Sequence, residues 1–352
     1  GFESIQGFLS HRFGRAGTVC YNVVVGVRLV SEVFANLLVV GILFGVAGTS
    51  LYTAAILGFA LATLLYAMLG GLHASLRTDL FQMVVFLLTL VALVTLVAVD
   101  GAFASENLLF VPFELTDPGP ILILVALLQI WSYPMHDPVM MDRGFLADRR
   151  TTWLSFMHAA WISLVCIVAF GSLGIVAGAQ AVDGEAMTTV LQRLLGETPM
   201  LLFNIALVIS AMSTLDSTLS SASKLVVVDM RLLPMGVSNG RWVMSLFMLL
   251  GLLLVFWGNK DLFSAVAVSG TASLFLLPVV FFSLWGERTD VLVWSYVGTF
   301  LVAMLGAALY YVESSGHTQW LGDAHKYTKL LYISLTVIVT GCSLYMPVSY
   351  TH

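Results

Sequence analysis

The chain has 352 residues, of which 59% are hydrophobic and only 10% are charged, and its mean hydropathy is +0.97. A soluble domain of this length has no interior large enough to bury so much apolar surface, so the composition indicates an integral membrane protein. The net charge of -5 is spread over the loops and does not indicate a nucleic acid or another anionic partner.

Apolar runs of roughly 20 residues, each long enough to cross a ~30 Å hydrocarbon core, recur along the chain. They predict an all-α polytopic protein with about ten membrane helices. The expected ranges are 18–47, 51–70, 79–99, 120–138, 153–178, 200–228, 242–257, 262–284, 291–312 and 328–347.

Basic residues alternate between the loops, beginning with Arg12 and Arg15 before the first expected helix and continuing with Arg77 after the second. Cytoplasmic loops hold an excess of Lys and Arg, so we expect the N-terminal loop to be cytoplasmic and the protein to lie in the cell membrane, that is, the inner or plasma membrane. The first 17 residues have loop character and the chain begins with Gly1, from which we expect a further segment upstream.

Two expected helices, 18–47 and 200–228, are longer than a bilayer requires. Four others separate them, so the two long helices cross the membrane in opposite directions. Such a pair is typical of inverted-topology repeats of five helices.

The helix at 200–228 carries a stripe of hydroxyl groups along one face, because its polar residues recur at helical spacing. The residues are Ser210, Ser213, Thr214, Ser217 and Ser221. Hydroxyls in membrane helices often satisfy the carbonyl four residues earlier and allow close packing, which is one interpretation. The other is that the stripe supplies part of the oxygen cage of a hard cation such as Na⁺.

Asp216 lies beside this stripe, and a carboxylate within a membrane span is a functional candidate because it requires a partner. Lys224 is eight residues further on, roughly 12 Å along a helix, which is too far for direct contact. A cation is therefore the better partner. Asp79 has a simpler interpretation, since with Gln82 it forms a capping box at the start of the helix at 79–99.

Four stretches in order resemble the sodium:solute symporter family, which includes the proline, glucose and sialic acid symporters. They are GGLHASLRTDLFQ, YPMHDPVMMDRGFLADRRT, SAMSTLDSTLSSAS and SGTASLFLLPVVFFSLWGER. The resemblance implies an inverted five-plus-five repeat transporter fold in a single membrane domain, 1–352. Residues 1–284 resemble core helices three to ten and residues 285–352 two peripheral helices, so the fold is expected to be N-terminally incomplete.

The resemblance also implies cation sites on the polar helix. Ser210 would offer its carbonyl, and Ser213 and Thr214 their hydroxyls, to the family's common Na⁺ site. A second cation site would comprise Asp79, Ser213, Asp216 and Ser217. Asp216 departs from the all-hydroxyl version of that site, and either strengthens cation binding or takes up a proton instead.

The solute is expected near a predicted helix interruption at Pro134 and Pro138. Tyr133 resembles an aromatic gate of the sugar-transporting members, and the candidate substrate or gate residues are Gln129, Tyr133, His136 and Asp137. Ordinary helix-end chemistry with an interfacial aromatic explains them equally well. Arg28 and Glu32, one turn apart, are expected to pair with each other.

The resemblance thus implies a Na⁺-coupled secondary active symporter that imports a small organic solute by alternating access, with Na⁺ as the co-transported ion. No catalytic arrangement or phosphate-binding motif indicates an enzyme. The alternative function is a transporter-like sensor or receptor domain of a signalling protein. The expected partners are a small-molecule solute, Na⁺ and the lipid bilayer, and the sequence sets neither the solute nor the oligomeric state.

Overall fold

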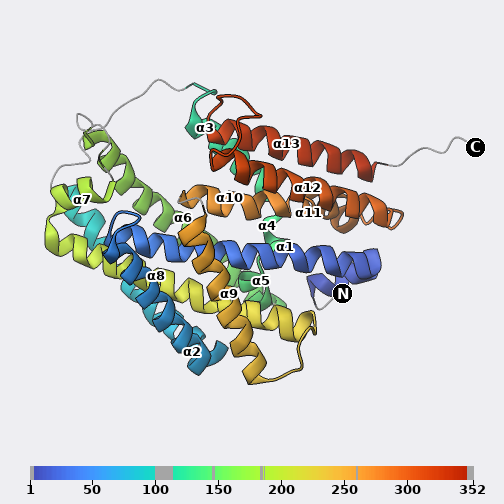
Figure 1. The fold of residues 1–352 in the computed structure, drawn as a ribbon, viewed down its shortest axis with the longest axis horizontal. Helices are drawn as coiled ribbons and strands as arrows, with labels where there is room; N and C mark the ends of the chain where they lie inside the picture. The colour runs from blue at the N-terminus through green and yellow to red at the C-terminus, as the bar shows by residue number, and fades with distance from the viewer. Residues whose placement is uncertain are drawn as a thin grey trace, which may run out of the picture. The chain divides into compact units, whose positions relative to one another are not determined.

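The computed structural model describes residues 4–99, 114–144, 147–182, 185, 187–258 and 261–346, with the side chains of residues 71–77 and 142–143 left aside. Every regular element in this part of the chain is helical (Figure 1). Eight of the described helical segments are long and apolar enough to cross a membrane, or nine if one bent pair counts as a single span. The chain is a multi-pass membrane protein.

Nine of the ten predicted ranges coincide with these spans. They are α1 (Ile5–Phe44), the two halves of α2 (Ser50–Val99), α6 (Arg149–Gln180), α8 with the π-helical segment η2 (Glu197–Lys224 and Leu225–Asp229), α9 (Val237–Trp257), the bent pair α10 (Leu262–Ser273) with α11 (Leu276–Pro278) and η3 (Val279–Trp285), α12 (Val293–Ser314) and α13 (Lys326–Tyr345). The bend in the pair is 47°.

The predicted span at 120–138 is shorter in the structure. The apolar helix α3 covers only Pro118–Gln129, and two short helices follow it, α4 (Tyr133–His136) and α5 (Pro138–Gly144). Pro134 and Pro138 each begin a helical turn, because proline is tolerated in a first turn and not in a helix interior. The interruption that these prolines predict is confirmed.

The prediction of a loop over the first 17 residues is wrong. α1 begins at Ile5. A kink at Gly14, whose φ of 60° and ψ of -143° are non-helical, separates its first turns from the rest of the helix. Arg12, which suggested a loop, donates a hydrogen bond to the Ser283 carbonyl at 3.2 Å. The Arg12 guanidinium is thus bound to a backbone carbonyl of η3, and it lies within a helix and not in a loop.

The two halves of α2 fold back on each other. Tyr66 Oη and Thr78 Oγ1 share a hydrogen bond although they are 12 residues apart. A straight helix would separate them by roughly 18 Å, so α2 reverses direction between these two residues. The spans Ser50–Gly70 and Thr78–Val99 therefore form two crossings, as the sequence predicts.

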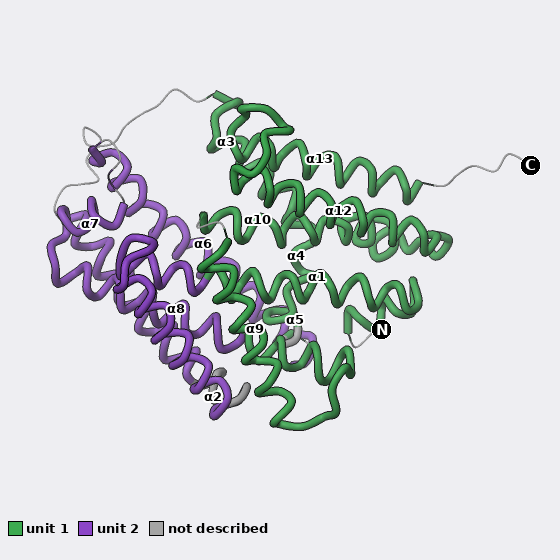
Figure 2. Tube along the Cα trace, viewed as in Figure 1, with its two compact units in different colours: residues 1–35, 113–146, 218–352 green, residues 36–112, 147–217 purple. Residues whose placement is uncertain are grey.

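The chain divides into two compact units, shown in different colours in Figure 2. Unit 1 comprises Gly1–Ala35, Phe113–Leu146 and Thr218–His352, and unit 2 comprises Asn36–Pro112 and Ala147–Ser217. In unit 2, α2, α6, α7 (Met187–Leu195) and the first part of α8 share an apolar core. Its buried members are Leu90, Leu93, Val97, Leu173, Val176, Ala177, Val190, Leu191, Met200 and Phe203.

In unit 1, α10 packs against α12, α13 and α3, and α12 lies along α13 (Figure 1). The start of α1 joins this group, because the ring of Phe13 stacks on Tyr296 at 4.3 Å and Tyr296 Oη donates to the Gly17 carbonyl at 3.0 Å. α1 is also the most buried span. Its most apolar window is 61% buried, against 17% for α6, whose side chains are therefore available to lipid.

We expect Gly251→Ala to destabilise the protein by about 1–3 kcal/mol, because a Cβ at this position of α9 would overlap Val33 Cγ1 of α1. Gly26→Ala is the matched control, since nothing lies within 4 Å of a Cβ there. Thermal unfolding of the detergent-solubilised protein measures both. Equal melting temperatures for the two variants would contradict the close approach of α9 and α1.

Asp261 anchors the start of α10 to the start of α13. Its carboxylate accepts hydrogen bonds from Ser264 N–H at 3.3 Å, from Ser264 Oγ at 2.6 Å and from Lys326 Nζ at 3.0 Å. Partial burial opposes ionisation, but the bonds from Ser264 and Lys326 outweigh it and lower the pKa of Asp261. The ionised carboxylate is therefore the stabilising form.

We expect Asp261→Ala to lower stability by about 1 kcal/mol at pH 7, the usual value of a helix cap. A carboxylate with a lowered pKa stabilises the fold above its unfolded pKa, so the difference from the wild type should shrink as the pH falls below about 4. Thermal unfolding at pH 7 and at lower pH measures this. The exposed Asp323→Ala is the control, and a difference that does not change with pH would contradict the account.

Candidate functional site

The hydroxyl stripe of α8 is half-buried at the three residues predicted to hold Na⁺. Thr214 Oγ1 donates a hydrogen bond to the Ser210 carbonyl at 3.1 Å, which places two of the predicted oxygen ligands side by side. This is also the bond expected if the hydroxyl simply satisfies the preceding turn. The pair alone therefore agrees with both interpretations of the stripe.

Ser213, in contrast to Thr214, forms a hydrogen bond with a residue of another helix. Its Oγ donates a short hydrogen bond to Asp79 Oδ1, which lies on α2, 134 positions earlier in the chain. The carboxylate of Asp79 contacts α8, which its interpretation as a helix cap does not include. The structure thus brings together two members of the predicted second cation site.

The other two members of that site, Asp216 and Ser217, are more deeply buried, with exposed fractions of 1% and 4%. Ser217 Oγ donates to Asp216 Oδ1 at 3.2 Å. All of these oxygens lie within unit 2, on α8 and α2. Hydroxyl, carbonyl and carboxylate oxygens are the donor types that hard cations prefer, so the residues fit a Na⁺ ion chemically.

Lys224, at the end of α8, pairs with Asp229. Its Nζ lies 3.4 Å from Asp229 Oδ2, and this ion pair spans the π-helical segment η2.

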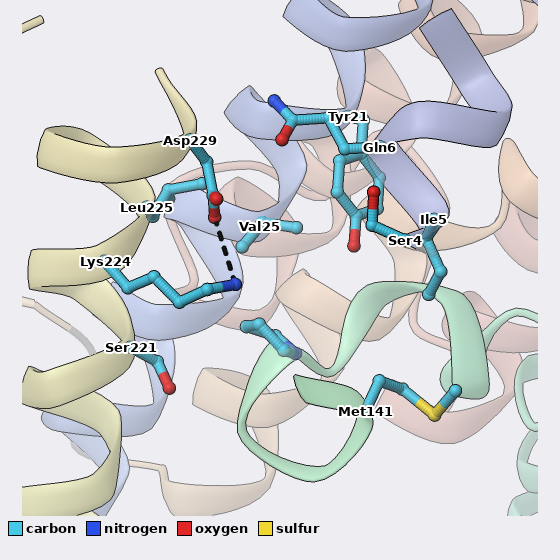
Figure 3. A pocket seen from close by; sticks show the side chains of 11 residues that line it. Ser4, Ile5, Gln6, Tyr21, Val25, Met141, Ser221, Lys224, Leu225 and Asp229 are labelled. Carbon is cyan, nitrogen blue, oxygen red and sulfur yellow. Dashed lines mark hydrogen bonds and ion pairs between the residues drawn. The ribbon is translucent and has the colours of Figure 1, made fainter. Parts of the chain in front are cut away.

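A polar cavity of about 70 Å³ lies between α1, α5 and the end of α8, all within unit 1 (Figure 3). Lys224 and Asp229 line one side of it and Gln6 and Tyr21 the other. Ser221, the last hydroxyl of the predicted stripe, also lines it. A cavity of this size holds a few water molecules, since each needs roughly 10–15 Å³.

Three of the four candidate gate residues gather around Arg28 of α1. Tyr133 Oη accepts a hydrogen bond from Arg28 Nη2 at 3.1 Å, and Asp137 Oδ2 lies 3.5 Å from the same nitrogen. His136 packs its ring edge-on against Tyr133 at 5.1 Å and bonds through Nδ1 to the Ser132 carbonyl at 3.0 Å. The expected pair of Arg28 and Glu32 is also present, at 3.4 Å.

Gln129 belongs to a different set of contacts. Its side-chain amide nitrogen lies 3.5 Å from Ser334 Oγ on α13, and its oxygen occupies the space that a Cβ at Gly270 would need. Next to it, Ser132 Oγ and Ser273 Oγ share a buried hydrogen bond at 3.1 Å. α3 therefore approaches α10 closely at Gly270, and this glycine is the signal in the sequence from which the contact could have been predicted.

The comparisons with known proteins concern mainly the fold. No family model and no curated protein matches the sequence. Among solved structures, the chain resembles a Na⁺-coupled sialic acid symporter, described in a substrate-bound outward-open state with a novel Na⁺ site. The TM-score is 0.71 at 16% sequence identity, and the match covers 98% of this chain and 78% of that chain. The fold is that of a polytopic helical transporter.

We expect Tyr133→Phe to destabilise the protein by about 1–3 kcal/mol, because it removes a hydrogen-bond acceptor from the buried Arg28 guanidinium. Tyr332→Phe is the control, since Tyr332 of α13 is 53% exposed. Thermal unfolding in detergent measures both variants. If Tyr133→Phe is no more harmful than Tyr332→Phe, the contact with Arg28 is not a stabilising one.

Proposed function

We propose that the protein is a Na⁺-coupled secondary active symporter that imports a small organic solute by alternating access. Two lines of evidence support this proposal. One is the likeness in fold to a Na⁺-coupled symporter. The other is the gathering of hydroxyl, carbonyl and carboxylate oxygens on α8 and α2, since these are the donors that a hard cation prefers.

The hydrogen bond between Ser213 and Asp79 is the observation on which the proposal mainly rests. A carboxylate inside a membrane span is stable only beside a partner, and here the partner is the hydroxyl stripe of a second helix. A stripe that served only helix packing would not require a carboxylate to face it. A cation between these oxygens would give both groups a stronger partner than they give each other.

The first Na⁺ would be held by the Ser210 carbonyl and the hydroxyls of Ser213 and Thr214. Some of its ligands would come from elsewhere, because a hard cation takes about six oxygens. A second cation would be held by Asp79 and Ser213, with Asp216 and Ser217 one turn further along α8. We therefore propose two cations per transport cycle.

The energy available from Na⁺ is sufficient for concentrative uptake. A membrane potential of about 100 mV contributes roughly 2.3 kcal/mol per charge. A tenfold Na⁺ gradient adds about 1.4 kcal/mol. A single Na⁺ thus concentrates a neutral solute by roughly 500-fold at equilibrium.

In the proposed cycle, external Na⁺ binds first and stabilises the outward-open state, which then admits the solute. Broken helices at the midplane are the usual place for a solute in transporters of this kind. We propose that the interruption around Tyr133, between α3 and α5, serves as such a break. Inward rocking then weakens the cation site, and Na⁺ and solute leave to the cytoplasm.

The melting temperature of the purified protein should be higher in NaCl than in KCl at equal ionic strength, because a ligand that binds only the folded state stabilises it. Thr214→Ala should reduce this Na⁺-specific increase, since the first site would lose one of its hydroxyl ligands. Asp79→Asn should reduce it without abolishing it, since only the second site would be lost.

Thr336→Ala is the matched control, because Thr336 makes the same bond to a carbonyl four residues earlier but is exposed on α13. It should leave the difference between the two salts unchanged. If the wild type melts at the same temperature in both salts, the stripe serves packing and the sensor function gains support.

A further inference from the structure

Two buried side-chain oxygens of unit 2 have no hydrogen-bond partner in the part of the chain that the structure describes. They are Oγ1 of Thr63, in the first half of α2, and Oε1 of Gln82, in its second half. Thr63 is 0% exposed and Gln82 is 6% exposed. Leaving a buried polar group without a partner costs about 1–3 kcal/mol. One polar ligand would compensate for both oxygens if they lie close together.

Both residues lie on the faces by which the two halves of α2 contact the rest of the protein. The most apolar window of each half is only 22% buried. The buried residues of the first half recur at helical spacing and are Tyr52, Ile56, Ala60, Thr63 and Ala67. Those of the second half do the same and are Gln82, Leu90, Leu93 and Val97. Thr63 and Gln82 therefore point away from lipid.

The hydrogen bond between Tyr66 and Thr78 sets the level of Thr63 and Gln82 along α2. Gln82 is one turn after Thr78 in the second half. Thr63 is one turn before Tyr66 in the first half, on the side toward which a tyrosine side chain leans in a helix. Because the two halves run in opposite directions, both steps lead the same way from the hydrogen bond. Thr63 and Gln82 are thus at about the same level.

Gln82 also points toward Asp79, the carboxylate that accepts the hydrogen bond from Ser213. With 3.6 residues per turn, Gln82 lies between Thr78 and Asp79 around the helix axis, about 40° from the first and about 60° from the second. Long side chains of a helix lean back over the preceding turn, which brings the amide group of Gln82 toward Asp79. Its oxygen is therefore directed at the space between the first half of α2 and α8.

The side chains of α8 converge on this level from the opposite direction. α8 is antiparallel to the second half of α2, because Asp79 bonds to Ser213 while Leu93, further along α2, shares an apolar core with Phe203, nearer the start of α8. Side chains of α8 lean toward its start, which here is the direction of Gln82. Ser213 and Gln82 thus approach the Asp79 carboxylate from two different helices.

We propose that Gln82 and Thr63 are ligands of the second cation, which Asp79 and Ser213 would also hold. This role rests on the proposed function and adds to it an amide oxygen and a hydroxyl from α2. A hard cation takes about six oxygens from several directions, and neutral oxygens of these two types are among those it accepts. The cation compensates for the two oxygens to which the protein offers no hydrogen-bond donor.

Each residue has a substitution that removes the oxygen and keeps the approximate shape, Thr63→Val and Gln82→Leu. In KCl, both should leave the melting temperature unchanged or raise it, because they remove a buried oxygen that has no partner. Both should also reduce the Na⁺-specific increase in melting temperature toward that of Asp79→Asn. A residue that served only packing would not produce this contrast between the salts.

Thr63→Ser keeps the hydroxyl and should retain the response to Na⁺. Thr95→Val is the matched control on the same helix, because Thr95 is exposed and its hydroxyl donates to the Val91 carbonyl at 2.7 Å. It should leave the difference between the two salts unchanged.

The test is the melting temperature of these variants in a titration with NaCl, with KCl added to hold the ionic strength constant. Loss of one ligand should raise the Na⁺ concentration that the second site needs by roughly tenfold. The role of Gln82 and Thr63 is overturned if both variants respond to Na⁺ as the wild type does. It is also overturned if both are destabilised equally in the two salts, as loss of a structural contact or of a bound water would require.

Asp79→Asn separates this role from the proposed function. A wild type without any Na⁺-specific increase would contradict the proposed function itself. An increase that Asp79→Asn reduces, and that Thr63→Val and Gln82→Leu leave intact, would contradict only the role of these two residues.

Discussion

A lipid bilayer offers no hydrogen-bond partner, so each charge or hydroxyl in a membrane span must find one within the protein. This constraint explains the contacts that matter most here. Ser213 of α8 donates a hydrogen bond to Asp79 of α2. Arg28 of α1 donates to Tyr133 and Asp137, which lie in the interrupted segment after α3. In both cases a polar residue on one helix identifies the neighbour against which that helix packs.

The two polar sites lie in different compact units and have different chemistry. The oxygens of α8 and α2 in unit 2 combine hydroxyls, a carbonyl and carboxylates, which suits a hard monovalent cation. The cluster in unit 1 is built on the guanidinium of Arg28, which contacts Tyr133, Glu32 and Asp137.

Much of the fold was predictable from the sequence, because apolar runs of fixed length determine where membrane helices lie. The start of α1 was not, because Arg12 and Arg15 resemble loop residues until Arg12 is seen to bond to the Ser283 carbonyl. The hydroxyl stripe of α8 followed from helical spacing alone. The role of Asp79 did not, because a local capping pattern competes with a contact 134 positions away that no local rule contains.

Direct binding of radioactive Na⁺ to the purified protein tests the central claim. The account predicts saturable binding that excess unlabelled NaCl displaces and KCl does not, with two ions per protein in the wild type and one in Asp79→Asn. Thr214→Ala should lose the ion at the first site. Binding no greater in the wild type than in Thr214→Ala, and equally displaced by KCl, would contradict a sodium site on α8.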